Sequence, residues 1–197
     1  MLEIDKIECK ELMIAMKDCE QTKGLSIFAH GLSVNNYFQD LRNHILNKEN
    51  LKYEWRLPDW IYNENLWSEL ENINDINQYQ IFHDCGKPFC LKIDDEGKRH
   101  FPDHAKKSSE IWFNLTGNVI QSELIAHDMD IHLLKMDQFN EFYKLPYHTT
   151  LLITGLCEIH SNASMFGGIE SDSFKIKWKK INKIGKKINE LKEKYYE

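Results

Sequence analysis

Most of the chain alternates apolar and polar positions with the period of an α-helix. Between Gly24 and Asn47 the apolar positions recur every three or four residues, and polar positions lie opposite them. The apolar stripe consists of His30, Val34, Tyr37, Leu41 and Ile45, and the polar face of Asn35, Asn36, Gln39 and Asp40. This spacing predicts a helix over 24–47 with the His30 side chain pointing into the core.

Three segments in the second half of the chain show the same periodicity. In 118–135 a stripe predicts one helical face, formed by Ile120, Leu124, His127, Ile131 and Leu134. Segment 148–163 predicts a helix that turns Leu151, Leu152, Leu156 and Ile159 inward and carries Glu158 at the edge of its buried face. Segment 174–195 is amphipathic, with an apolar seam of Phe174, Trp178, Ile181, Ile184, Ile188, Leu191 and Tyr195. That seam must be buried on the body or in a homodimer, and docking on the body is favoured because a coiled coil needs a longer seam.

Shorter signals divide the remaining chain. Segment 48–77 is rich in Asn and large aromatic residues and contains Pro58, which predicts an insertion of irregular structure and short helices. A helix over 76–85 should end at a left-handed Gly86, since Pro88 cannot continue it. A β-hairpin is expected about Asp95-Glu96-Gly97, and Pro102 should lie in the first turn of the helix that carries His104. These elements together predict an all-α fold with one small hairpin and an amphipathic C-terminal helix.

Length and composition fit one domain over 1–197, with its core at about 24–163. No apolar run is long enough to span a membrane, the N-terminus is too acidic for a signal peptide, and the five cysteines lack paired spacing, so we expect a cytoplasmic protein with reduced thiols. Net charge is −6, but nine lysines against three glutamates give the segment from Lys175 onward +6, which leaves −12 for the rest. Such a body is not typical of a general nucleic-acid binder, and the basic tail most simply faces water.

Ligand-type side chains interrupt the apolar faces of several predicted helices. They are His30, the doublet His83-Asp84, His104, His127 and Glu158. One buried histidine is usually a satisfied core residue, but a shared divalent cation would satisfy the whole set. The mixture of imidazole and carboxylate suits Mn, Fe, Ni, Co, Zn or Mg, as one or two ions, rather than Ca.

The motifs "FAHGLSVNNYF", "FHDCGKP" and "HFPDHAKKSSEIW" occur in an order that resembles the HD-domain metal-dependent phosphohydrolase superfamily. The pattern is most similar to the HD domains of bacterial tRNA nucleotidyltransferases, whose catalytic domain this chain lacks. The resemblance covers about Gly24 to Ala163 and implies an all-helical bundle with His30, His83, Asp84 and a late acidic residue as metal ligands. The best match for that residue is Glu158 where the family usually has Asp, with Asp172 or His160 as alternatives. His104 and His127 match the additional histidines of members that hold two metals.

The expected reaction is phosphoester hydrolysis, with Asp84 and Lys87 as catalytic residues. Lys87 directly follows the doublet and is the main candidate for contacting the substrate phosphate, ahead of Arg99 and Lys107. The resemblance favours a nucleotide or an RNA phosphate end, such as a 2′,3′-cyclic phosphate, as substrate. The alternatives are hydrolysis of a free signalling nucleotide, for example a cyclic dinucleotide, and a non-catalytic HD-fold protein that binds a nucleotide.

Overall fold

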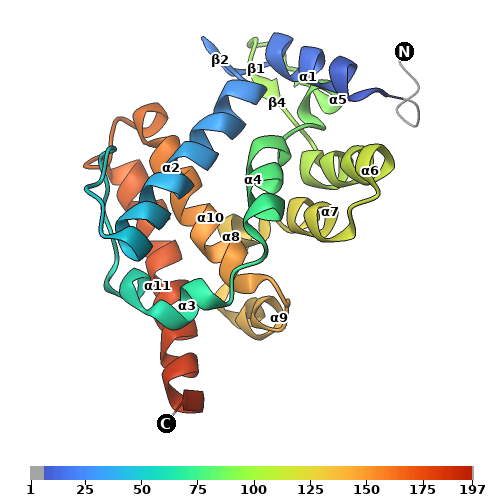
Figure 1. Ribbon diagram of the computed structural model, residues 1–197. Helices are drawn as coiled ribbons and strands as arrows, with labels where there is room; N and C mark the ends of the chain where they lie inside the picture. The colour runs from blue at the N-terminus through green and yellow to red at the C-terminus, as the bar shows by residue number, and fades with distance from the viewer. Residues whose placement is uncertain (1–6, 197) are drawn as a thin grey trace. The chain divides into compact units, whose positions relative to one another are not determined.

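The computed structural model describes residues 7–196, with side chains through 194 (Figure 1). Helices make up most of it, and the strands form two short antiparallel hairpins, which confirms the all-α prediction. The chain divides into two compact units, one of residues 7–35 with Ile73–Met129 and one of Asn36–Asn72 with residues 130–196. The single domain expected over 1–197 stays a prediction. None of the described helices is both long enough and apolar enough to cross a membrane.

The first unit contains the beginning of the long helix α2 and the helices and hairpins that surround it in sequence. In chain order these are α1 (Cys9–Asp18), β1 (Glu20–Thr22), β2 (Leu25–Ser26), α2 (Ile27–Asn47), α4 (Ile73–Phe82), α5 (Lys87–Cys90), β3 (Lys92–Ile93), β4 (Arg99–His100), α6 (His104–Thr116) and α7 (Val119–Ala126). Helices α6 and α7 pack against each other, and α4 packs against α7 (Figure 1). The hairpin β3–β4 forms where the sequence predicts it, with Gly97 at φ +76° in its turn.

The second unit contains the rest of α2 and the C-terminal half of the chain. Its elements are η2 (Asp59–Tyr62), α3 (Glu64–Ser68), α8 (Asp130–Leu133), η3 (Met136–Gln138), α9 (Phe139–Tyr143), α10 (His148–Ser161), η4 (Ala163–Phe166) and α11 (Asp172–Tyr196). The short helices η2 and α3 are the only helical structure between Lys48 and Asn72 of this unit, which confirms the irregular character predicted for most of the insertion.

The C-terminal helix α11 buries its apolar seam within the second unit, where it packs against α10 (Figure 1). Phe174, Ile181, Ile184 and Ile188 are almost fully buried. Gly185 permits close packing, because a Cβ there would lie 2.2 Å from the Trp60 ring. Docking of the seam on the body is therefore confirmed, except for the Tyr195 side chain, which lies outside the described residues. Association as a homodimer stays a prediction.

Asp40 differs from the prediction that placed it on the polar face of α2. It is only 4% exposed, and its carboxylate accepts hydrogen bonds from the backbone N–H groups of Lys52 and Tyr53 and from Trp55 Nε1, at 2.9–3.1 Å. The polar residue is buried because it anchors the backbone of the inserted segment, a requirement that helical periodicity does not report.

The helix predicted over 118–135 is also divided. It ends at Ala126 and a separate helix, α8, begins at Asp130, so the predicted stripe is not one continuous face. Ile120 is 43% exposed, while Gln121 and Ser122 are buried in its place. The Trp112 Nε1 group donates to the Gln121 side chain at 2.7 Å, and this bond lets α7 turn a polar residue toward α6. Pro102 is likewise displaced, since α6 begins two residues later, at His104.

Candidate metal centre

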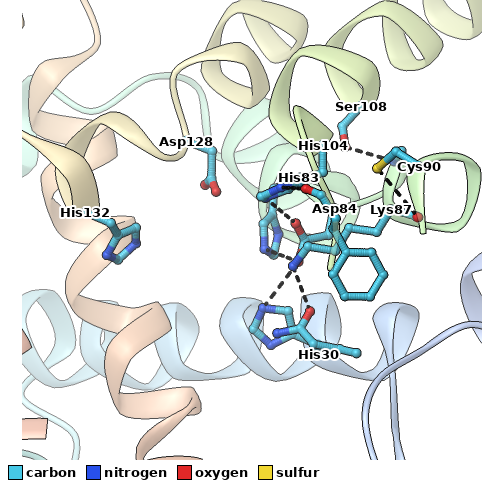
Figure 2. Close-up of polar contacts among 12 residues, drawn as sticks. His30, His83, Asp84, Lys87, Cys90, His104, Ser108, Asp128 and His132 are labelled. Carbon is cyan, nitrogen blue, oxygen red and sulfur yellow. Dashed lines mark hydrogen bonds and ion pairs between the residues drawn. The ribbon is translucent and has the colours of Figure 1, made fainter. Parts of the chain in front are cut away.

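Asp84 lies at the centre of a buried group of ionisable side chains in the first unit, which we call the Asp84 cluster (Figure 2). Asp84 Oδ2 lies 3.2 Å from His83 Nε2 and 3.7 Å from His30 Nε2, and Asp84 Oδ1 lies 3.5 Å from His104 Nε2. Lys87 completes the cluster, with Nζ donating to Asp84 Oδ2 at 2.6 Å. The structure thus brings together five residues that the sequence analysis singled out, from α2, α6 and the segment after α4.

The imidazoles are oriented by the protein backbone. His83 Nδ1 lies 2.9 Å from the carbonyl oxygen of Gln80, and His104 Nδ1 lies 2.9 Å from that of Phe101. A carbonyl accepts only from a nitrogen that bears a proton, so Nδ1 is protonated in each ring and Nε2 is the atom that faces Asp84. Backbone carbonyls fix metal-binding histidines in this manner in many proteins.

Two glycines let the helices approach closely enough to form the cluster. A Cβ on Gly31, next to His30, would lie 2.1 Å from the carbonyl oxygen of Ile81 in α4. A Cβ on Gly86, two residues after Asp84, would lie 2.5 Å from the backbone nitrogen of Ser108 in α6. The backbones therefore meet where a side chain would separate them, and the Gly86 N–H donates to Ser108 Oγ at 2.8 Å.

The prediction of a left-handed helix cap at Gly86 is wrong. Gly86 has φ −81° and forms the N-cap of the short helix α5, in which Pro88 occupies the first turn. The preceding helix already ends at Phe82, so His83 and Asp84 lie in the turn between α4 and α5. Glycine is required at this position by the close approach of α6 rather than by the backbone angle.

Asp84 is ionised in this setting. Burial raises its pKa, but the charges of the neighbouring His83 and Lys87 together outweigh that effect and hold the pKa well below its usual range. Lys87 is itself 9% exposed, and its second hydrogen bond, at 3.0 Å, is to the Gln21 side chain. The carboxylate therefore carries its charge in a buried site where Lys87 donates to it directly.

His30, His83 and Asp84 could hold a metal ion. Each of the three offers one ligand atom, and these atoms all lie within 4.8 Å of one another. Among the described residues, this is the group of three or more His, Cys, Asp or Glu side chains that is arranged in this way. Two imidazoles and a carboxylate suit a divalent transition metal better than an all-oxygen ion such as Ca²⁺. The donor set and its orientation therefore fit the ion that the sequence predicts.

Two predicted ligands contact other side chains in the structure. His127 caps the end of α7, with Nε2 3.9 Å from Glu123 Oε2. Glu158 belongs to the second unit, where its Oε2 lies 2.7 Å from His132 Nε2. Both remain predictions as metal ligands.

The alternatives to Glu158 are also in the second unit. His160 has both ring nitrogens engaged, since Nδ1 lies 2.7 Å from the Leu156 carbonyl and Nε2 accepts from the Arg56 N–H at 3.0 Å. Asp172 is exposed at the first position of α11. The His160 ring therefore has no nitrogen left for a metal in this conformation.

The weaker phosphate candidates form surface ion pairs. Arg99 Nη2 lies 3.1 Å from Glu20 Oε2, and Lys107 Nζ lies 3.4 Å from Glu110 Oε2. Lys87 is the cation that directly contacts Asp84, which agrees with its proximity in the sequence.

One buried carboxylate of the first unit was not singled out in the sequence. Asp128 is 3% exposed and its Oδ1 accepts a hydrogen bond from the Tyr79 hydroxyl at 2.6 Å (Figure 2 includes Asp128). Tyr79 belongs to α4, the helix that directly precedes the doublet His83-Asp84. The signal was present, because Asp128 follows His127 at the end of an apolar helix just as Asp84 follows His83.

No protein-family model, curated protein or solved structure matches the chain. The functional interpretation therefore depends on the chemistry of the Asp84 cluster and on the sequence resemblance described above.

Proposed function

We propose that the protein is a metal-dependent phosphohydrolase of the HD superfamily that acts on a nucleotide or on an RNA phosphate end. The observation that supports this most strongly is the convergence of His30, His83 and Asp84, all at most 2% exposed, within 4.8 Å of one another. Burying this many ionisable groups costs free energy, and that cost is accepted in proteins mainly at functional sites.

His30, His83 and Asp84 would bind the ion, and His104, whose Nε2 lies 3.5 Å from Asp84 Oδ1, would join them. Asp128 is our candidate for an additional carboxylate ligand in preference to Glu158, because it belongs to the same compact unit as the doublet and Glu158 contacts His132. A divalent ion bound there supplies the Lewis-acid chemistry on which phosphoester hydrolysis depends. Asp84 would supply a charged oxygen ligand, and the backbone carbonyls would keep the unprotonated Nε2 atoms of His83 and His104 directed inward.

Lys87 would bind the phosphate. Its charge neutralises Asp84, so a divalent ion added to the cluster leaves an excess of positive charge, and an anionic phosphoryl group is the natural complement. The ammonium group has three donors, of which the structure uses two, toward Asp84 and Gln21. Turning of Nζ from Asp84 to a substrate oxygen would keep the charge of the lysine compensated.

The ion pair between Lys87 and Asp84 also favours one alternative, a non-catalytic protein that binds a nucleotide. A carboxylate already neutralised at 2.6 Å can remain buried without an ion. A hydrolase of a signalling nucleotide, by contrast, would use the same residues as our proposal and differ only in substrate.

The test is metal analysis of the purified protein together with a hydrolysis screen in Mn²⁺ over mononucleotides, 2′,3′-cyclic nucleotides, cyclic dinucleotides and RNA ends. We expect hydrolysis of at least one phosphoester, abolished in Asp84→Asn and unchanged in the matched control Asp137→Asn, whose side chain is exposed. Tight nucleotide binding with no hydrolysis under any metal would instead support the non-catalytic alternative.

A further inference from the structure

The β3–β4 hairpin forms one wall of an open hollow of about 610 Å³, which we call the hairpin hollow. Its lining consists of Lys92, Ile93, Asp94, His100, Phe101 and Pro102. Ile93 is 62% exposed, an unusual state for an isoleucine on a strand, and it contributes an apolar surface to the hollow. The volume lies in the range of about 300–1,000 Å³ that small-molecule sites occupy.

Phe101 connects this hollow to the Asp84 cluster. The Phe101 ring lies under Lys87 Nζ at 5.4 Å, and the Phe101 carbonyl oxygen orients His104 through Nδ1. The same residue therefore lines the hollow and contacts two members of the cluster. A residue that lines the hollow is thus in direct contact with the proposed phosphate-binding lysine.

The accessible side of the cluster is also the side that Phe101 contacts. The side chains of Lys87 and His104 are 11% and 16% exposed, whereas those of His30, His83 and Asp84 are at most 2% exposed. A ligand would therefore reach Asp84 past Lys87 and His104. A phosphate bound there would place the remainder of its molecule toward the hollow.

The polar part of the hollow is held in a fixed arrangement. Asp94 accepts from the backbone N–H groups of Glu96 and Lys98, at 3.1 and 2.8 Å, and its Oδ2 lies 2.6 Å from His100 Nε2. The turn thus positions the carboxylate, and the carboxylate positions the imidazole. An apolar surface with a few oriented polar groups is what small-molecule sites share, and a flat heteroaromatic ring has the complementary apolar faces and polar edge.

We propose that the hairpin hollow binds the nucleobase of the substrate, with the ring packed on Ile93 and Phe101 and its polar edge toward Asp94 and His100. This inference rests on the proposed function, since it takes the phosphate to lie at Lys87. It restricts the substrate class to phosphoesters that carry an aromatic base within one sugar of the phosphate, and it excludes sugar phosphates.

Binding can be measured without turnover, in EDTA, by titrating the protein with 2-aminopurine riboside 5′-monophosphate, whose fluorescence is quenched when the base stacks on an aromatic ring. AMP and ribose 5-phosphate serve as competitors. We expect quenching, and competition by AMP at least roughly tenfold better than by ribose 5-phosphate, because only AMP fills the apolar hollow.

Two variants and a matched control locate the base. Ile93→Ser should weaken AMP binding roughly tenfold and leave ribose 5-phosphate unaffected, and Phe101→Leu should remove the quenching while keeping the side-chain bulk. The control is Ile176→Ser, which changes an isoleucine of similar exposure (69%) on α11 and should have no effect. Equal competition by AMP and ribose 5-phosphate, no binding of either nucleotide, or an unchanged Ile93→Ser protein would overturn the proposal.

The outcome separates this inference from the proposed function. Asp84-dependent hydrolysis together with equal competition would refute the base subsite alone. Base-dependent binding in the hollow with no hydrolysis under any metal would refute the phosphohydrolase and leave the nucleobase site in place.

Discussion

The two units each bring imidazole and carboxylate groups together, but in different ways. In the second unit His132 and Glu158 form one contact of 2.7 Å, and Lys180 Nζ donates to the His132 carbonyl. In the first unit Asp84 faces three imidazoles at 3.2–3.7 Å. The His132–Glu158 contact of the second unit is a closed pair in which each group satisfies the other. The Asp84 cluster of the first unit has several inward-facing nitrogens for one carboxylate, at distances longer than a strong hydrogen bond.

The difference teaches that proximity of His and Asp or Glu does not by itself indicate a metal site. The His132–Glu158 pair is about 15% exposed, so water can also solvate it, whereas the Asp84 cluster is buried and has little such compensation. Orientation separates them further, because backbone carbonyls hold the His83 and His104 rings with Nε2 toward Asp84. A shared ion is the simplest partner for such a set.

The largest expected effect tests which cluster binds metal. Double substitution of His83 and Asp84 by Ala should abolish metal content and hydrolysis, because it removes two of the three residues that can share an ion. Glu158→Gln, which breaks only the closed pair, should retain the metal. Elemental analysis of both proteins checks this. Full occupancy in the double variant would refute the proposed site, and loss of metal in Glu158→Gln would restore Glu158 as a ligand.

The next effect concerns phosphate binding. If Lys87 stabilises charge on the phosphoryl group, Lys87→Ala should lower kcat/KM by about 10²-fold, or about 2.7 kcal/mol, with metal content intact. The control neutralises Lys179, Lys183 and Lys186, which are exposed on α11, and should change the rate on a mononucleotide little. Steady-state kinetics of both variants on one small substrate decide the matter. An unaffected Lys87→Ala beside an impaired α11 variant would place the phosphate elsewhere.

A third prediction concerns His160 of the second unit, whose two ring nitrogens both have hydrogen-bond partners. Burial lowers the pKa of His160 to about 4, and the Arg56 N–H that points at its Nε2 leaves no room for a second proton. The unfolded chain binds that proton at about pH 6.5, so His160 should reduce stability as pH falls from about 6.5 toward 4, by about 2 kcal/mol at pH 5. Above pH 6.5 this penalty is absent.

Denaturant unfolding at pH 7.5 and pH 5 measures this effect, with His160→Gln as the comparison. The variant has no group that titrates at this position, so its stability should fall less between the two pH values than that of the unmodified protein. His44→Gln is the matched control, because its ring is in an exposed contact with the Glu49 carbonyl. An identical pH dependence in the His160→Gln protein and the unmodified one would contradict the prediction.

Much of the cluster could be predicted from sequence because its residues interrupt simple patterns. His30 occupies an apolar position of α2, and the doublet follows an apolar helix, so periodicity alone marks both. The hairpin and the amphipathic α11 were predictable for the same reason. The family resemblance, the substrate and the cytoplasmic location stay predictions.

The rest depends on contacts between segments distant in sequence. Gly86 carries the signal of a helix cap, but its role is set by the backbone of α6, twenty-two residues away. Asp40 seemed a surface residue until the inserted segment supplied three donors. Asp128 follows a histidine as Asp84 does, but its burial depends on the Tyr79 hydroxyl, which lies 49 residues earlier. Local periodicity reports which face is buried but not which buried polar group has found a partner.

The smallest expected effect tests whether Asp128 extends the Asp84 cluster or forms a closed pair of its own with Tyr79. If Asp128 is a ligand, the Tyr79 hydroxyl orients it, and Tyr79→Phe should lower metal affinity by about tenfold, as loss of such orienting groups does in other metal sites. Asp128→Asn should lower it further, since it removes the ligand charge. Tyr143→Phe is the matched control, because it removes a tyrosine hydroxyl from the second unit. Metal titration measures the three affinities. If Tyr79→Phe and Asp128→Asn alter thermal stability but leave metal affinity equal to that of the control, then Tyr79 and Asp128 are a closed structural pair like His132 and Glu158, and the ion would be held by His30, His83, Asp84 and His104 without them.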